Sequence, residues 1–171
     1  SGMNNFVRAL TVYNGNLIAG GLFTTAGGTT VNRIAQWNGT AWSLVGDPNE
    51  NGVDGSVRAL AEYNGSLYIG GWFSHAGNMS ADFIARWNGA AWSAVGSGVN
   101  APVASFAVNN DLLFIGGNFT AAGHLGANYI VGWNGSSMLP LGIGMGGQGV
   151  YTLLDYHGDL EHYAVAKERL F

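Results

Sequence analysis

The chain has 171 residues, six Lys and Arg against ten Asp and Glu, and a formal net charge of −4. Because it has no basic cluster, the sequence lacks the positive potential that nucleic acid or an anionic membrane surface attracts, and we expect neither as a partner. The absence of cysteine excludes disulfides, thiolate nucleophiles and cysteine-ligated metals.

One sequence unit recurs along the chain. Its opening segment, Val7-Arg8-Ala9-Leu10, returns at 57–60, 103–106 and 150–153, at spacings of 50, 46 and 47 residues. Gly-Gly pairs and Trp-Asn-Gly triplets keep the same step. A period of this length predicts a repeat architecture. We therefore interpret residues 1–171 as one repeat domain, with units over 5–52, 53–100 and 101–146 and a partial fourth unit and tail over 147–171.

Short apolar segments separated by Asn-Gly predict four antiparallel strands in each unit. In the first unit we expect strands over 7–13, 16–23, 33–37 and 41–45, with turns at Asn14-Gly15 and Asn38-Gly39 and a longer loop over 24–32. Asn-Gly favours a two-residue type I′ turn, because both residues tolerate a positive φ. Over 150–160 the chain starts the strand pattern again, and the segment after it matches no unit.

The strands are continuously apolar, as in Leu67-Tyr68-Ile69, where a sheet with one face in water would alternate. Neighbouring sheets must therefore cover both faces, which is typical of β-propeller blades. The predicted fold is an all-β propeller of about three and a half blades per chain, fewer than a closed ring needs. We expect homo-oligomerisation to close the ring, most simply as a two-fold dimer. The residues expected to associate are Val7 and Leu10 with Val150 and Leu153.

The segment Leu67-Tyr68-Ile69-Gly70-Gly71, followed by the spaced aromatics Trp87 and Trp92, resembles a kelch-type propeller repeat. The likeness covers residues 7–142 and is greatest to kelch-like repeats of large secreted or cell-surface proteins, including the fungal cortical-polarity-marker family and many bacterial surface proteins. It implies a secreted or surface location, although no export signal opens the sequence.

The resemblance also bears on catalysis. The catalytic branch of kelch-like propellers, the copper radical oxidases, would imply a Cys–Tyr cross-link with His and Tyr ligands, and this chain has no cysteine. No nucleophile elbow, phosphate loop or paired carboxylate is present either. We expect no enzyme activity, no cofactor and no metal.

Arg8 and Arg58 occupy the same position in consecutive units, on the strand expected to line the central channel. Two arginines there predict a basic ring that binds an anion or carboxylate. The alternative, structural ion pairs or solvated side chains at the channel mouth, is favoured because the next units carry Ala104 and Tyr151 instead.

Aromatic residues give a further candidate. Trp72 lies outside the repeat pattern, since its counterparts are Leu22 and Asn118, and it is the candidate for an exposed ligand contact, for example with a glycan. The other tryptophans keep the repeat spacing and are predicted to pack within the units: Trp37, Trp42, Trp87, Trp92 and Trp133.

His75 and His124 are three residues out of step with the repeat, which predicts solvated loop histidines rather than a repeated metal or acid–base site. Asp47, Glu50 and Asp54 match a calcium loop only loosely, and a solvated loop is the better prediction.

Together these patterns predict a non-catalytic binding or scaffold module that presents a glycan or protein ligand on its ring faces. Two alternatives remain at this level. One is a truncated or engineered propeller fragment with no ligand of its own, and the other is a lectin-like carbohydrate-binding module.

Overall fold

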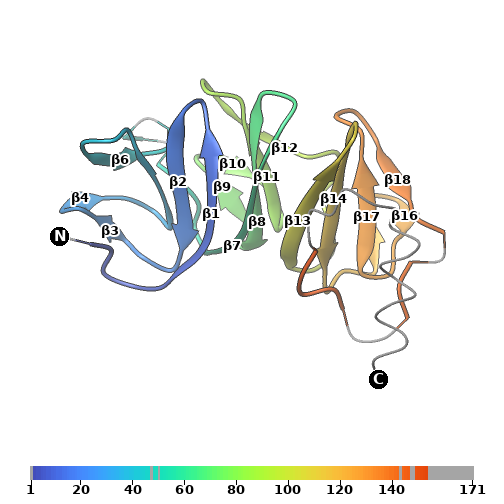
Figure 1. Cartoon of the computed structure of the whole chain (residues 1–171). Helices are drawn as coiled ribbons and strands as arrows, with labels where there is room; N and C mark the ends of the chain where they lie inside the picture. The colour runs from blue at the N-terminus through green and yellow to red at the C-terminus, as the bar shows by residue number, and fades with distance from the viewer. Residues whose placement is uncertain (1, 47, 50, 143, 147–148, 154–171) are drawn as a thin grey trace.

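The computed structural model describes residues 2–46, 48–49, 51–142, 144–146 and 149–153. Three four-stranded antiparallel sheets stand side by side in chain order (Figure 1). No helix occurs among the described residues, which confirms the all-β prediction for them. The fourth unit is predicted to start its first strand at residue 150, but residues 149–153 form no strand. The predicted second strand of that unit and the tail lie outside the described residues.

Each sheet is a meander of consecutive strands, interrupted once by the long loop of its unit. The first strands of the three sheets are edge strands, and β7 lies between β1 and β13. The first sheet contains β1 (Val7–Tyr13), β2 (Asn16–Gly21), β5 (Ile34–Trp37) and β6 (Trp42–Leu44). The second contains β7 (Ser56–Tyr63), β8 (Ser66–Trp72), β11 (Ile84–Trp87) and β12 (Trp92–Ala94), and the third β13 (Val103–Asn109), β14 (Leu112–Gly117), β17 (Ile130–Trp133) and β18 (Met138–Pro140).

The long loop of each unit contains a small hairpin, which the sequence did not predict. A buried alanine in each hairpin explains it, because the segment that leads into the unit bridges to this alanine: Met3 to Ala26, Val53 to Ala76 and Val99 to Ala122. The hairpins are β3 (Thr25–Ala26) with β4 (Thr29–Thr30), β9 (His75–Ala76) with β10 (Met79–Ser80), and β15 (Ala121–Ala122) with β16 (Leu125–Gly126).

The two Asn-Gly turns of a unit differ in geometry. At Asn14-Gly15 both residues have positive φ, 48° and 76°, as a type I′ turn requires. At Asn38-Gly39 only the glycine does, with φ 95°. There the Asn38 side-chain oxygen accepts hydrogen bonds at 2.9 Å from the two backbone amides after Gly39. The side chain therefore organises a four-residue loop, and the predicted two-residue turn is wrong at this position.

A non-glycine residue with positive φ ends each long loop. These residues are Arg33 (φ 60°), Phe83 (φ 64°) and Tyr129 (φ 69°). Each donates its N–H to a phenylalanine carbonyl at the start of the loop and accepts a hydrogen bond from the second glycine of the Gly-Gly pair. Because this geometry costs free energy in a bulky residue, the hydrogen bonds on both sides must enforce it.

One contact repeats between neighbouring units, and we call it the Val-on-Gly contact. A valine and a larger apolar side chain from the first segment of one unit lie directly over the first glycine of the Gly-Gly pair in the unit before it. No side chain would fit between them. The contacts are Val57 and Leu60 over Gly20, Val103 and Phe106 over Gly70, and Val150 and Leu153 over Gly116.

Tyrosine hydroxyls join the sheets a second time. Tyr13, at the end of β1, donates a hydrogen bond to the Gly65 carbonyl in the turn of the second sheet at 3.4 Å. Tyr63, at the end of β7, donates to the Asp111 carbonyl in the turn of the third sheet. Burial, with Tyr68 and Asp111 nearby, raises the pKa of Tyr63, so its hydroxyl stays protonated as a donor at neutral pH.

Four of the five tryptophans at repeat positions pack in pairs within their own sheets, as predicted. Trp37 lies against Trp42 with ring centroids 5.5 Å apart, and Trp87 lies against Trp92 at 5.1 Å. In the third sheet, where the outer tryptophan is missing, Trp133 is buried and donates its ring N–H to the Tyr68 hydroxyl at 3.0 Å.

The Val-on-Gly contact can be tested at Gly70. A Cβ there would lie 2.5 Å from Val103 Cγ1 and 2.9 Å from Phe106 Cζ. We expect Gly70→Ala to lower the free energy of unfolding by about 1–3 kcal/mol, because the packed side chains must shift. Gly126→Ala is the matched control, since its Cβ would meet nothing within 4 Å. Urea unfolding measures both, and equal midpoints for the two variants would contradict the contact.

Candidate functional site

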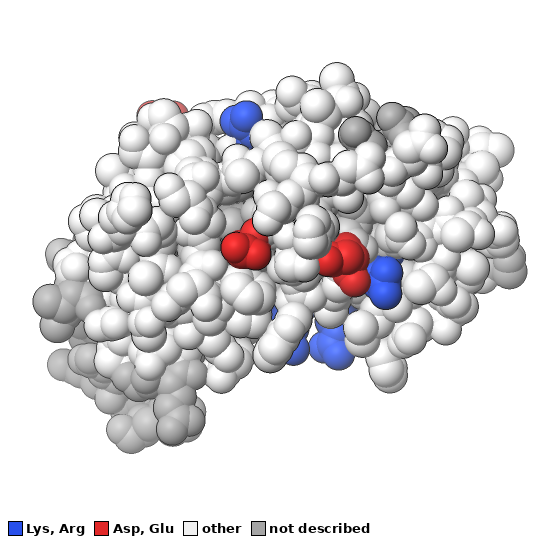
Figure 2. Space-filling model, turned by 180° about the vertical axis from the view of Figure 1, so that it is seen from behind, with Lys and Arg blue, Asp and Glu red and all other residues white. Residues whose placement is uncertain are grey.

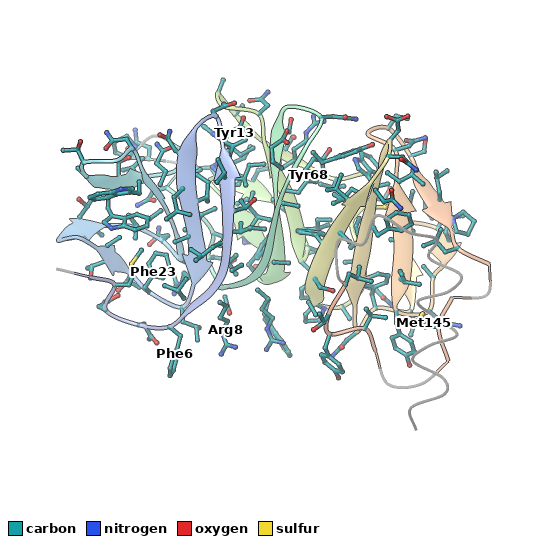
Figure 3. All side chains as sticks on the ribbon, in the orientation of Figure 1. Phe6, Arg8, Tyr13, Phe23, Tyr68 and Met145 are labelled. Atoms are coloured by element: carbon teal, nitrogen blue, oxygen red, sulfur yellow. The ribbon has the colours of Figure 1, made fainter. Side chains whose placement is uncertain are left out.

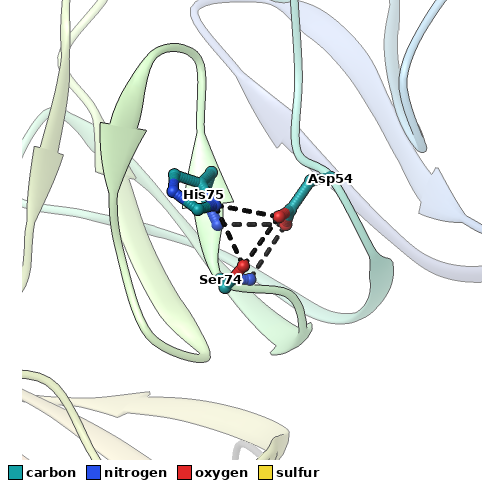
Figure 4. Close-up of polar contacts among 3 residues, drawn as sticks. All are labelled: Asp54, Ser74 and His75. Atoms are coloured by element: carbon teal, nitrogen blue, oxygen red, sulfur yellow. Dashed lines mark hydrogen bonds and ion pairs between the residues drawn. The ribbon is translucent and has the colours of Figure 1, made fainter.

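A polar cluster of Asp54, Ser74 and His75 joins the entry segment of the second unit to its long loop (Figure 4). Asp54 Oδ1 accepts hydrogen bonds from the backbone amides of Ser74 at 2.9 Å and His75 at 3.0 Å. Asp54 Oδ2 accepts from the Ser74 hydroxyl at 2.7 Å and lies 3.0 Å from His75 Nδ1. The cluster thus contains the residue types of a nucleophilic triad.

The geometry of the cluster is not that of a triad. Ser74 Oγ and Asp54 Oδ2 both lie beside His75 Nδ1, at 2.9 and 3.0 Å, so the imidazole does not stand between them. A triad needs the serine at one ring nitrogen and the carboxylate at the other. The side chains of His75 and Asp54 are also 53% and 44% exposed, so water competes for every proton transfer.

The other two units show what this arrangement does. Asn4 Oδ1 accepts from the amides of Thr24 and Thr25 at 2.8 and 3.0 Å, and Asn100 Oδ1 accepts from those of Thr120 and Ala121 at 2.9 and 3.0 Å. The shared role is to hold the long loop against the entry segment. The second unit differs in using a carboxylate and a histidine for it.

Sequence reasoning missed this role of Asp54 and grouped the residue with Asp47 and Glu50, which lie outside the described residues. A signal was present, because Asn4, Asp54 and Asn100 keep the spacing of the repeat. His124 is exposed in the turn between β15 and β16. Across the described part of the chain, no group of three or more His, Asp or Glu residues could hold a metal ion.

The Asp54 carboxyl titrates abnormally. Partial burial alone would raise its pKa, but the hydrogen bonds from His75 and Ser74 together outweigh burial and hold the pKa of Asp54 well below its usual range. A carboxyl whose pKa is lower in the folded state adds stability above its unfolded pKa, about 4, and this stability disappears as the pH falls toward the folded pKa.

Asp54→Asn tests this behaviour, because asparagine is the residue that the other two units use. We expect its free energy of unfolding at pH 7 to stay within about 0.5 kcal/mol of the native value, and its loss of stability below about pH 4 to be smaller. Asp54→Ala should cost about 1 kcal/mol at pH 7, since two backbone amides lose their acceptor. Urea unfolding at pH values from 7 down to acid pH measures these free energies. If the free energy of unfolding fell identically with pH in the native protein and in Asp54→Asn, the lowered pKa of Asp54 would be refuted.

The outer face of β1, formed by Val7, Leu10 and Val12, is exposed; we call it the β1 face. Relative exposures are 43%, 61% and 61%, whereas Val57, the counterpart of Val7, is fully buried. Within the described residues no unit precedes β1 to supply a Gly-Gly pair. Val12 was not predicted here, and the sequence carries no signal for it, because the later units have Glu62 and Val108 instead.

The other two residues predicted to associate lie elsewhere. Val150 and Leu153 are buried, at 3% and 9% exposure, against the third sheet of their own chain. The predicted contact of Val7 and Leu10 with Val150 and Leu153 of a second chain stays a prediction, and these two residues have an apolar partner in their own chain. The Val-on-Gly contact with Gly116 already occupies the latter pair.

Arg8 and Arg58 lie at the irregularities of β1 and β7, where the strand register shifts between Val7 and Ala9 and between Val57 and Ala59. Arg8 is exposed and extends, with Phe6, past the lower end of the first sheet in the view of Figure 3. Arg58 is half-buried. Within the described residues neither forms an ion pair or a side-chain hydrogen bond. Of the two alternatives that the sequence left open, this excludes structural ion pairs and leaves solvated side chains, with which the exposure of Arg8 agrees.

Trp72 is 60% exposed at the end of β8. It pairs with Ser56, so it lies at the same end of the second sheet as Arg58. The three residues predicted to contact a ligand, Arg8, Arg58 and Trp72, thus occupy one end of two neighbouring sheets.

Comparison with known proteins assigns no family. No protein-family model matches the chain, and no curated protein matches it. Among the described residues, no helix is long and apolar enough to cross a membrane. The fold therefore defines the class, which is an all-β protein of three repeated four-stranded antiparallel sheets.

Proposed function

We propose that the three sheets are blades of a kelch-like β-propeller, and that the chain is a non-catalytic binding or scaffold module that completes its ring with a second copy of itself. The observation that carries the proposal is the Val-on-Gly contact, which recurs at every junction between described units, while Val7 and Leu10 of the β1 face remain exposed.

The β1 face has the form of one half of that contact. In the second unit, the residues that correspond to Val7 and Leu10 are covered by the first sheet, and in the third unit by the second sheet. Three blades are fewer than a closed propeller contains, since four to eight are typical. A second copy is the cover we propose for the β1 face, because a two-fold arrangement buries the face of both chains at once.

The binding role is favoured over catalysis by the chemistry of the described side chains. The Ser74, His75 and Asp54 cluster is explained by loop attachment, because Asn4 and Asn100 do the same in the other units. No cysteine is available as a nucleophile.

Leu10→Lys tests the assembly. We expect the native protein to sediment as a dimer and Leu10→Lys to sediment as a monomer, because a lysine charge would have to be buried in an apolar contact. Leu125→Lys is the matched control, since Leu125 is also exposed but lies in the β15–β16 hairpin, and it should remain a dimer. Sedimentation velocity measures all three. A native protein that is monomeric at every concentration would overturn the proposal and favour a piece of a longer propeller.

A second candidate function, carbohydrate binding, is favoured by Trp72 alone. An exposed indole can stack on the apolar face of a sugar, and Trp72 is the most exposed tryptophan that the structure describes.

A glycan array tests this candidate. We expect Trp72→Ala to weaken any specific glycan signal by about tenfold, equivalent to ~1.4 kcal/mol. Tyr151→Ala, which removes another exposed aromatic ring, should leave the signal unchanged. Silence of the native protein across the array would exclude this function for the glycans displayed.

A further inference from the structure

Arg8 and Arg58 place two guanidinium groups on neighbouring strands of consecutive units. Both follow the first residue of a register shift, and β1 lies beside β7. Figure 3 shows Arg8 extending past the lower end of the first sheet, and Figure 2 shows two basic side chains next to each other at the lower edge of the molecule. The repeat thus brings two cations to one end of the structure.

These cations lack protein partners. Among the described residues the single ion pair joins His75 to Asp54. Arg58 Nε is buried without a hydrogen-bond acceptor. By contrast, Arg86 Nε donates to Ser93 Oγ at 3.1 Å. A buried N–H without an acceptor is unfavourable, more so in a charged group, and the Arg58 guanidinium therefore has no acceptor from the protein that would compete with a ligand for its charge.

From this arrangement we infer that Arg8 and Arg58 form a binding site for an oxyanion. Guanidinium groups match the planar, two-oxygen edge of carboxylate and phosphate groups, and the terminal nitrogens of Arg8 and Arg58 would donate to the oxygens of such a ligand. Both residues belong to one chain, so the site needs no second copy and goes beyond the proposed assembly. Ala104 in the third unit cannot contribute a charge, which confines the site to the first two units.

The experiment uses the full chain and two probes, succinate for carboxylates and inorganic phosphate for phosphates. The arginine Nε–H signals are followed by NMR during each titration. We expect a saturable shift of the Arg58 Nε–H signal with at least one probe, and the probe that binds more tightly identifies the ligand class. Arg8→Gln should weaken binding about tenfold, because one of two charge-assisted partners is lost. Arg58→Lys keeps the charge but lacks Nε, and should weaken binding as well.

Arg86→Gln is the matched control, because its Nε already has a partner, and it should bind like the native protein. Circular dichroism of each variant establishes that it is folded, and a misfolded Arg58→Lys would leave Arg8→Gln to decide. Shifts that grow linearly without saturation, or equal weakening by Arg86→Gln, would overturn the site and indicate only nonspecific attraction. Sedimentation of the same samples separates this outcome from a failure of the proposed dimer.

Discussion

The packing of a valine onto a glycine is the contact on which the arrangement of the sheets depends. A sheet whose two faces are both apolar is stable only if something covers each face. Here the cover is the next sheet, and it can approach closely because the first glycine of each Gly-Gly pair carries no side chain. The same constraint applies to the β1 face, which no sheet covers among the described residues. It is half of a contact that elsewhere in the described chain is always complete.

Much of the fold could be predicted from the sequence, because each unit repeats the same pattern of apolar segments, turns and glycine pairs. The four strands of the first unit, the type I′ turn at Asn14 and the packing of the repeat tryptophans all follow from local patterns. The small hairpins of the long loops could not be predicted. They depend on bridges between alanines and entry segments about twenty residues away, and no local pattern within the loop indicates these bridges.

The candidate sites depend on side-chain contacts that the sequence does not indicate. The equivalence of Arg8 and Arg58 follows from their spacing, but their lack of carboxylate partners depends on side-chain placement, and the sequence left structural ion pairs and solvated side chains open as alternatives. Asp54 was assigned to an acidic loop because its neighbours in sequence are acidic. Its actual partners, Ser74 and His75, are twenty residues away. The places of Val150 and Leu153 likewise depended on whether the partial fourth unit packs on its own chain, which spacing cannot decide.

The positive-φ residues that end the long loops have a consequence for how this architecture can diversify. Arg33, Phe83 and Tyr129 differ in charge, size and polarity, yet they adopt the same backbone conformation between the same two hydrogen bonds. The backbone conformation at the base of each loop is thus compatible with three very different side chains. A substitution at this position can therefore change the surface of a unit while the two hydrogen bonds to the sheet are kept. Each unit can thus acquire its own surface chemistry by substitution in its long loop.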